Sequence, residues 1–228
     1  GYGLDVRTLD DNETQKAAPV LAKIINNSMY DGKGNEKEIE RAYFSGTGTI
    51  IALLDESKVA AFAKMINLPA TNTAYFSMLA CAREYKGTGL FTSSLMLSLG
   101  QGLEWGSDQV ACITANNRVL EKFADLKFMY DSDEPKDRGL ARKIAVERFG
   151  PKAELIEGFI LDGRVLESYP NVPVYEYART CRINDLFEPP FERKRCDRRL
   201  MFKRLNQETE DDYTAWLKAN NPSIFLAQ

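Results

Sequence analysis

The hydrophobic period of the chain changes at a glycine turn, and this joint constrains the fold more than any other feature. Residues 74–82 form an extended apolar run, and Gly87-Thr88-Gly89 follows. A helical stripe of apolar residues at every fourth position comes next, at Phe91, Leu95, Leu99 and Leu103. Glycine adopts positive φ readily and lets a ligand approach the backbone. Because the first turn of a helix carries free N–H groups and a positive dipole end, the joint predicts a site for an anion such as a phosphate.

Other periodic segments place this joint within a longer series of elements. Strands are predicted at residues 4–9, 49–54, 59–66, 109–114 and 199–205, with further extended pieces at 155–161 and 172–177. Helices are predicted around residues 18–25, 39–44, 117–126 and 138–149, and near Trp216. The order of these elements predicts the α/β class, with a mixed sheet and a crossover helix.

Composition excludes several classes of protein. With 228 residues, of which 44% are hydrophobic and 28% charged, the chain is expected to form one large globular domain without a disulfide or metal staple. It shows no signal peptide and no run of about 20 apolar residues, the length that a membrane helix needs. A net charge of -3 argues against binding that depends mainly on neutralising many phosphates. We expect a cytoplasmic protein.

The absence of histidine removes the commonest catalytic and metal-binding side chain. It excludes Ser-His-Asp and Cys-His catalysis and zinc bound by histidine. The four cysteines form no C-x-x-C pair and show no ligand-like spacing; they are Cys81, Cys112, Cys181 and Cys196. Cys81 and Cys112 lie in apolar runs and are expected to be buried, reduced thiols. We predict no metal site.

The glycine turn can be compared with three kinds of phosphate-binding loop. The chain has no G-x-x-x-x-G-K-[ST] sequence, and Thr92 stands where a G-x-G-x-x-G fingerprint has its third glycine. The run Glu84-Tyr85-Lys86-Gly87-Thr88-Gly89 instead resembles the pyrophosphate loop of the GNAT N-acetyltransferase superfamily. Two residues depart from that pattern, because Lys86 stands where Arg or Gln is usual and Phe91 where Gly or Ala is usual. A simple strand–helix turn is the alternative interpretation.

A second segment resembles the same family. There, a strand ends at an Asn and is followed by a helix that bears a Tyr and closes on Gly-Phe; here residues 110–116 lead to Lys127-Phe128. Asn116 either contacts the ligand or caps the helix that follows it. The resemblance covers about residues 4–130, with residues 199–205 as the last strand. It implies a GNAT-like mixed central sheet with flanking helices and a C-terminal insertion.

The resemblance also implies a site for acetyl-CoA, in a V-shaped gap between residues 77–82 and 109–114. The pyrophosphate would bind the amides of the turn, and a backbone N–H near Leu79 and Cys81 would polarise the thioester carbonyl. The acceptor would be an amine. The implied cofactor-binding residues are Lys86, Gly87, Thr88, Gly89, Leu90, Phe91, Thr92, Asn116 and Phe123.

The two proton transfers of such a reaction lack their usual residues. The acceptor ammonium must lose a proton and the departing thiolate must gain one. Phe123 occupies the position where the family often has an acidic Tyr, and no histidine can replace it. Our candidate for the acid is Tyr130; the other available groups are Tyr85, Tyr175, Tyr177 and Glu84.

The resemblance divides the chain into a core of residues 1–131 plus 199–206, an insertion at 132–198, and a C-terminal helix and tail at 207–228. The insertion either caps the substrate side or forms a separate partner surface. A basic patch is either a solvated strand edge or a site for the CoA 3′-phosphate or a nucleic acid; it comprises Arg193, Lys194, Arg195, Arg198, Arg199, Lys203 and Arg204. We expect an acyl-CoA-dependent N-acyltransferase. The alternatives are a non-catalytic protein of the same fold that binds a protein partner, and an enzyme that modifies nucleic acid.

Overall fold

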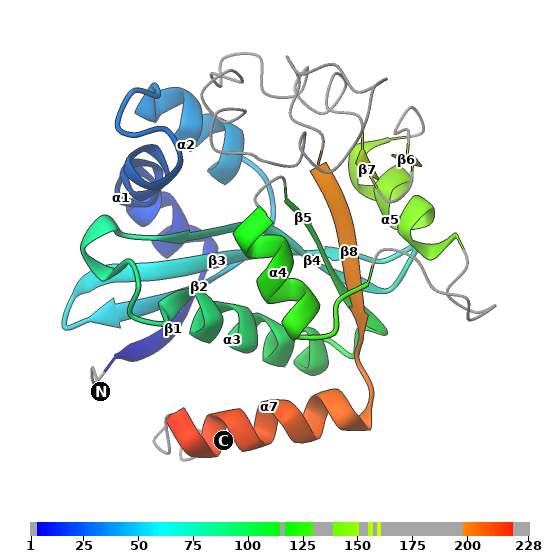
Figure 1. Ribbon diagram of the computed structural model, residues 1–228. Coiled ribbons are helices and arrows are strands. Elements are labelled where there is room, and N and C mark those ends of the chain that lie inside the picture. Colours follow the sequence, from blue (N-terminus) through cyan, green and yellow to red (C-terminus); the bar gives the residue numbers. More distant parts are fainter. Residues whose placement is uncertain are drawn as a thin grey trace.

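The computed structural model of the protein describes residues 4–114, 117–129, 139–150, 155–156, 159–160 and 198–220. A mixed sheet with the strand order β1-β2-β3-β4-β5-β8-β7-β6 runs through these residues, and helices cover both of its faces (Figure 1). The α/β class and the flanked mixed sheet expected from the periodic segments are therefore confirmed.

The first four strands form an antiparallel meander, and the sheet then changes direction. β4 pairs in parallel with β5, which pairs antiparallel with β8, and the short β7–β6 hairpin extends the outer edge of β8. The parallel pair requires a crossover, and α3 supplies it. The strand bounds are Asp5–Leu9 (β1), Thr49–Asp55 (β2), Lys58–Leu68 (β3), Thr73–Cys81 (β4), Gln109–Thr114 (β5), Leu155–Ile156 (β6), Phe159–Ile160 (β7) and Arg198–Arg204 (β8).

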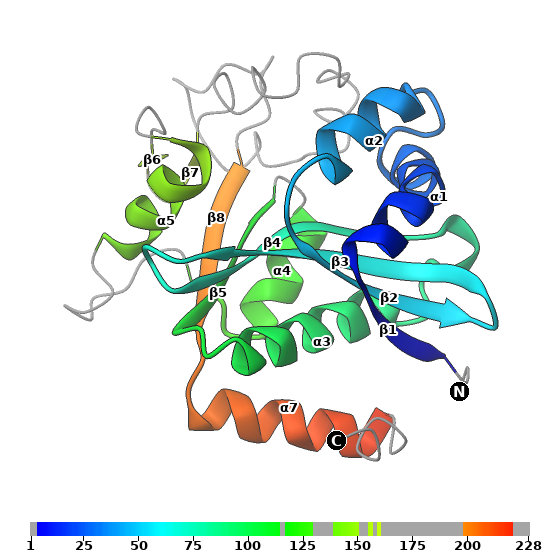
Figure 2. The ribbon, with the colours of Figure 1, turned by 180° about the vertical axis from the view of Figure 1, so that it is seen from behind.

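The helices lie on opposite faces of the sheet. α3, α4 and α7 cover one face (Figure 1), and α1, α2 and α5 cover the other, which Figure 2 shows from behind. The helix bounds are Asp11–Met29 (α1), Glu36–Phe44 (α2), Leu90–Glu104 (α3), Asn117–Asp125 (α4), Leu140–Phe149 (α5) and Gln207–Asn220 (α7). A short 3-10 turn, η1 (Arg83–Tyr85), precedes α3.

The sequence accounts for where these elements begin. Asp10 and Glu13 form a reciprocal capping box at the start of α1, in which each side chain accepts from the backbone N–H of the other residue, at 2.7 and 3.0 Å.

The predicted strand at residues 109–114 matches β5, and the predicted extended run at 155–161 contains β6 and β7. Phe128 leads into a single bridge between Met129 and Phe202. The predicted extended piece at 172–177 lies outside the described residues.

Three hydrophobic clusters make up the core. The α3 cluster lies on one face and includes Phe76, Leu95, Leu99, Val110, Phe123 and Met201. The α1–α2 cluster lies on the other face and includes Leu21, Ile25, Phe44, Phe62, Met78 and Ala80. The α5 cluster shares that second face and includes Tyr75, Ala111, Ile144, Leu200 and Phe202. The second face is therefore covered in two separate parts.

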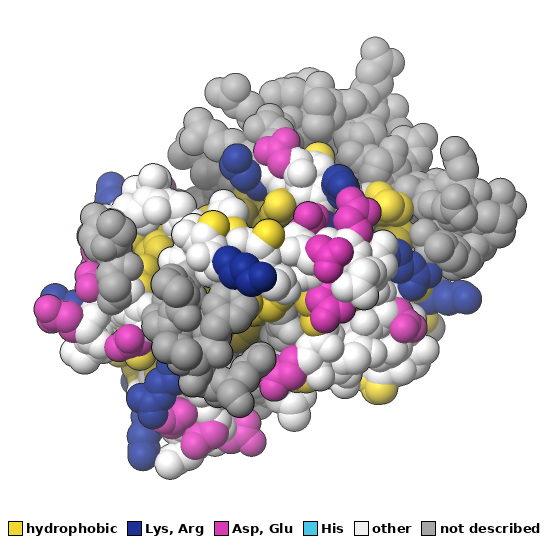
Figure 3. Space-filling view, turned by 90° about the horizontal axis from the view of Figure 1, so that it is seen from below, with side chains coloured by type: hydrophobic (Ala, Val, Ile, Leu, Met, Phe, Trp, Pro, Cys, Tyr) yellow, Lys and Arg dark blue, Asp and Glu magenta, His cyan; other side chains and the backbone are white. Residues whose placement is uncertain are grey.

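The C-terminal helix α7 packs against α3 on the lower side of the molecule, and Figure 3 shows that side with acidic side chains spread across it. Its exposed carboxylates are Glu208, Glu210, Asp211 and Asp212. Among the described residues, no helix combines the length and the apolar character that crossing a membrane requires.

Candidate functional site

The sheet opens between β4 and β5. The two parallel strands pair only as far as Phe76 and Cys112. At that point β4 contains a bulge, because Met65 and Lys64 on β3 face Phe76 and Met78, which leaves Ser77 without a partner residue. A bulge bends a strand and increases its twist. Beyond it β4 continues along β3 to Cys81, while β5 continues along β8 to Thr114, so the two strands diverge.

The diverging part of β4 contains Leu79 and Cys81, whose backbone N–H groups the resemblance assigns to the thioester carbonyl. In the described part of the chain this stretch of β4 pairs with β3 alone, so its other edge borders the opening. The side chains of Leu79 and Cys81 are half-buried and pack against the α3 cluster. Burial raises the pKa of the Cys81 thiol, which nearby Lys86 partly offsets. The raised pKa makes Cys81 a weaker nucleophile than an ordinary exposed thiol.

The turn between β4 and α3 is held in place by Tyr85. Its hydroxyl donates to Oδ2 of Asp55, at the end of β2, over 2.6 Å, and its ring packs against the clusters on both faces of the sheet. The Thr88 hydroxyl donates to the Tyr85 carbonyl oxygen, also over 2.6 Å. These contacts fix the backbone of the glycine turn before any ligand binds.

The glycine turn leads into backbone donors at the start of α3, while the N–H groups of Lys86 and Thr88 bond within the turn, to the carbonyl oxygens of Arg83 and Tyr85. Gly87 and Gly89 have φ of +82° and +88°, and a Cβ at either position would meet no atom within 4 Å. Gly89 caps α3 without a side-chain hydrogen bond, and the first turn of the helix contains no acidic residue. The first amides of a helix have no partner inside it, so those of Leu90, Phe91 and Thr92 point toward the turn. The arrangement fits a pyrophosphate, which needs close approach to several N–H groups.

The two departures from the family pattern contact each other. The rings of Phe91 and Phe123 lie with their centroids 6.5 Å apart. Phe123 is 4% exposed, and its ring also faces Phe76 at 6.5 Å and Phe128 at 4.9 Å. A hydroxyl at position 123 would enter this apolar group of rings. Phe91 and Phe123, the large residue and the residue without a hydroxyl, therefore pack together in one group of rings.

On the opposite face, two cationic side chains lie next to residues that flank the bulge of β4: Lys64 pairs with Met78 across β3 and β4, and Arg148 lies over Tyr75. Sequence reasoning missed both. Lys64 on β3 is 3% exposed and donates to the carbonyl oxygens of Tyr43 and Gly46 at 2.7 and 3.3 Å. The Arg148 guanidinium, from α5, lies 5.3 Å from the centroid of the Tyr75 ring. Burial, and then the charge of Arg148, lower the pKa of Lys64. The feature of the sequence that could have identified Lys64 is the position of this lysine inside the apolar run of residues 60–65.

Other sequence candidates lie elsewhere or outside the described residues. Asn116 and Tyr130 fall outside them, as do Cys181 and Cys196. Of the basic patch, Lys203 is buried and donates to the Leu126 carbonyl oxygen at 2.9 Å. Arg204 donates to Oε1 of Gln109. No group of three or more His, Cys, Asp or Glu side chains within the described ranges could hold a metal ion.

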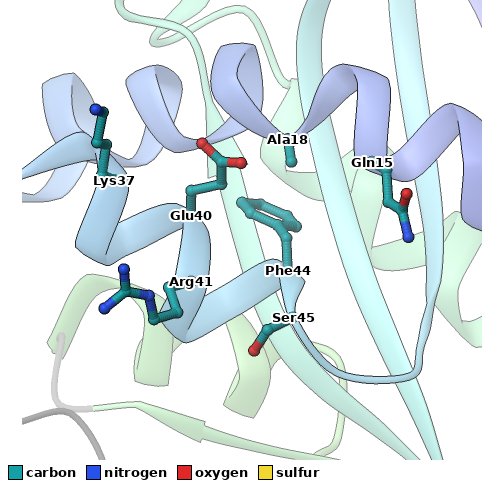
Figure 4. Close-up of a pocket in the computed structure, with 7 residues that line it drawn as sticks. All are labelled: Gln15, Ala18, Lys37, Glu40, Arg41, Phe44 and Ser45. Carbon is teal, nitrogen blue, oxygen red and sulfur yellow. The ribbon is translucent and has the colours of Figure 1, made fainter.

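A separate hollow of about 630 Å³ lies between α1 and α2 (Figure 4). Figure 4 shows Glu40 and Phe44 extending from α2 toward α1, with Arg41 directed away. The lining residues are Gln15, Ala18, Lys37, Glu40, Arg41, Phe44 and Ser45. None of them belongs to β4, the glycine turn or α3, so this hollow is not part of the opening between β4 and β5.

Comparisons with known proteins find similarity in structure alone. No protein-family model and no curated protein sequence matches the chain. A mutant form of the spermidine/spermine N-acetyltransferase of Vibrio cholerae matches with a TM-score of 0.53 and 11% identity, over 94% of this chain and 98% of that one. The proposed acetyltransferase yncA of Salmonella typhimurium, solved with its cofactor acetyl-CoA, matches with a TM-score of 0.50 and 9% identity, over 90% and 95%.

N-acetylglutamate synthase of Neisseria gonorrhoeae, solved with coenzyme A and N-acetyl-glutamate, is also similar. Its TM-score is 0.50 at 12% identity, and the match covers 91% of this chain and 36% of that one. At such low identity these matches show a shared fold and nothing finer.

Proposed function

Because the chain has the fold of the GNAT N-acetyltransferases, we propose that it is an acyl-CoA-dependent N-acyltransferase that uses acetyl-CoA and an amine acceptor. The observation that carries this proposal is the uncapped start of α3 at Gly89, in the turn that follows β4. An opening between β4 and β5 begins at Ser77 on the same strand. A simple strand–helix turn would require neither the open space at Gly87 and Gly89 nor the divergence of the strands.

In this proposal the residues of the chain bind and orient rather than form a covalent intermediate. Lys86 and the turn of residues 87–92 bind the pyrophosphate, through backbone N–H groups other than that of Thr88, which donates to the Tyr85 carbonyl oxygen at 3.3 Å. Phe91 and Phe123 form the apolar wall beyond it. Acetyl-CoA would supply the thioester that the acceptor amine attacks directly. The backbone N–H groups of Leu79 and Cys81 donate to the carbonyl oxygen as negative charge develops, a contribution of about 3 kcal/mol in comparable sites. The raised pKa of the Cys81 thiol argues against attack by that side chain.

Because Phe123 can neither donate nor accept a proton, other groups must carry out the proton transfers. We propose Tyr130 as the acid that protonates the leaving thiolate. A thiolate with a pKa near 8.5 can also take its proton from water, so Tyr130→Phe is expected to lower kcat by about tenfold rather than abolish it. We propose Asn116 as a further contact of the cofactor. We also propose that residues 1–131 and 199–206 form the catalytic core and that residues 132–198 cap its acceptor side.

A purified sample would test the proposal directly. It would be incubated with acetyl-CoA and a mixed panel of amines, and release of the CoA thiol would be followed while mass spectrometry identifies the acetylated amine. Thiol release that depends on an amine supports the transferase. Binding of acetyl-CoA without any amine-dependent release would favour a non-catalytic protein of the same fold, the alternative suggested by the Phe91–Phe123 contact.

A further inference from the structure

On the sheet face opposite α3, polar residues separate the α1–α2 cluster from the α5 cluster. On β3, Phe62 belongs to the α1–α2 cluster and Ile66 packs against the α5 cluster. Lys64 lies between them on the same face, because strand residues two apart share a face. On β4, Met78 and Tyr75 belong to the same two clusters, and the bulged Ser77 lies between them. The boundary between the clusters therefore coincides with the point where β4 leaves β5.

Two cations lie along this boundary. The Arg148 guanidinium lies over the rings of Tyr75 and Phe149, at 5.3 and 5.2 Å from their centroids, and Tyr75 pairs with Ile66, two residues from Lys64 on β3. The charge of Arg148 adds to burial in lowering the pKa of Lys64. Within the part of the chain that the structure describes, no carboxylate forms a salt bridge with either side chain. Buried charges are ordinarily paired, because removing an unpaired charge from water is costly.

Both side chains also have unused donors. Lys64 carries three N–H groups as an ammonium, and the described residues accept from it at two carbonyl oxygens, those of Tyr43 and Gly46. The Nε of Arg148 is buried and has no hydrogen-bond partner. Buried donors without acceptors are rare in folded proteins and call for an explanation. A carboxylate, with two oxygens and about four acceptor positions, satisfies this set of donors.

We propose that Lys64 and Arg148 bind a carboxylate of the acceptor, so that the substrate is an amine that also carries a carboxylate, such as a free amino acid. The proposal rests on the proposed function, which places the thioester carbonyl at Leu79–Cys81, just beyond the bulge. On the α3 side, the rings of Phe76, Phe91 and Phe123 pack together in the apolar wall that the proposed function gives to the cofactor, so we place the acceptor on the face that holds the two cations. Positive charge there attracts a carboxylate and repels a polyamine.

The same charges assist the chemistry of the acceptor amine. A nearby positive charge disfavours an ammonium and lowers its pKa, so a larger fraction of the bound amine is neutral. Only the neutral amine has the lone pair that attacks a thioester. Binding the carboxylate and promoting loss of the amine's proton thus come from one pair of residues, in a chain without histidine.

Matched acceptors would test this inference. Each free α-amino acid would be compared with its own α-carboxamide, and spermidine would be added as a polycation, with kcat/KM as the measured quantity. A charge-assisted hydrogen bond corresponds to about 10- to 100-fold in an equilibrium constant, so the acids are expected to exceed the amides by at least about 10-fold. Equal rates for acid and amide, or a preference for spermidine, would overturn the inference.

Variants separate this role from a structural one. Arg148→Gln is expected to lower kcat/KM for the acid by about 10- to 100-fold. The rate with the amide should fall much less, since the amide loses only the effect of the positive charge on its amine. Arg148→Lys is expected to restore part of the loss with the acid. Arg142→Gln, an exposed position on the same helix, is the control. An equal effect of Arg148→Gln on both acceptors would indicate packing instead.

Calorimetric titration with acetyl-CoA keeps the two proposals distinguishable. If acetyl-CoA binds but neither acids nor amides react, the acceptor assignment fails and the cofactor site stands. If acetyl-CoA does not bind, the proposed function itself fails.

Discussion

Gly89 allows the anion site to be tested against a matched control in the same helix. It precedes α3 with φ of +88°, and Gly106 follows the helix with φ of +65°. A Cβ at either position would meet no atom within 4 Å. Replacing either glycine therefore introduces backbone strain without steric overlap, and the two positions differ in which end of the helix they occupy.

The expected magnitudes follow from these positions. A left-handed conformation costs a non-glycine residue about 1–2 kcal/mol, so Gly89→Ala and Gly106→Ala should lose similar amounts of the free energy of unfolding. Against roughly 5–15 kcal/mol for a folded protein, both variants stay folded. A glutamate is favoured by the dipole at the start of the helix and disfavoured at its end, by about 0.3–1 kcal/mol. Gly89→Glu should therefore be the more stable of the two glutamate variants.

The affinity for acetyl-CoA should rank the two glutamate variants in the opposite order. Two unit charges 4 Å apart interact by about 1 kcal/mol in water and about 4 kcal/mol at an effective dielectric constant of 20. Facing a pyrophosphate, the carboxylate of Gly89→Glu should cost about 2 kcal/mol or more, which is about 30-fold in Kd. Gly106→Glu should bind acetyl-CoA with the same Kd as the unmodified protein.

The assay is a calorimetric titration of all four variants with acetyl-CoA, alongside urea unfolding of each. Gly89→Glu combines higher stability than Gly106→Glu with weaker binding, a combination that general damage to the fold does not produce. An unchanged Kd in Gly89→Glu, or an equal loss in Gly106→Glu, would refute the assignment of the anion site to the start of α3.

Burial and Arg148 lower the pKa of Lys64 from 10.5, so between its folded value and 10.5 the unfolded chain binds more protons and stability rises with pH. Urea unfolding of the wild type and of Lys64→Met would measure this effect. The free energy of unfolding of the wild type, relative to that of Lys64→Met, should rise as the pH approaches 10.5. A fall in this difference would contradict the burial of the Lys64 ammonium. A Cβ on Gly100 would lie 2.2 Å from Cζ and Oη of Tyr213, so Gly100→Ala should cost about 1–3 kcal/mol in urea unfolding. Adding Tyr213→Ala should make the two losses less than additive, whereas full additivity would speak against this contact. Burial raises the pKa of the Cys81 thiol, so iodoacetamide should label the Cys81 peptide slowly and acetyl-CoA should slow it further, as followed by mass spectrometry. Labelling that acetyl-CoA leaves unchanged would place Cys81 away from the cofactor.

Local patterns of the sequence predict most of the elements, because each repeats with the period of its own secondary structure. The stripe through Leu95 and Leu99 is the buried side of α3, and the apolar run at residues 109–114 is β5. The glycine turn was also predictable, since positive φ at Gly87 and Gly89 is a local property of the backbone.

The features that shape the opening depend on contacts between distant segments. The bulge at Ser77 exists only relative to the register of β3. Phe91 and Phe123 look like two independent departures in the sequence, and only the packing of α3 on α4 joins them. Arg148 reaches Tyr75 through the docking of α5 on the sheet, which no local pattern encodes.

Thermal unfolding with and without acetyl-CoA tests the central claim most directly, with ATP as the control for a generic phosphate compound. A ligand that binds the folded state alone adds about 2.7 kcal/mol at 100 times its Kd, which is a rise in Tm of roughly 5–10 °C for a chain of this size. We predict such a rise with acetyl-CoA and none with ATP. An unchanged Tm at millimolar acetyl-CoA, or an equal rise with ATP, would contradict the account.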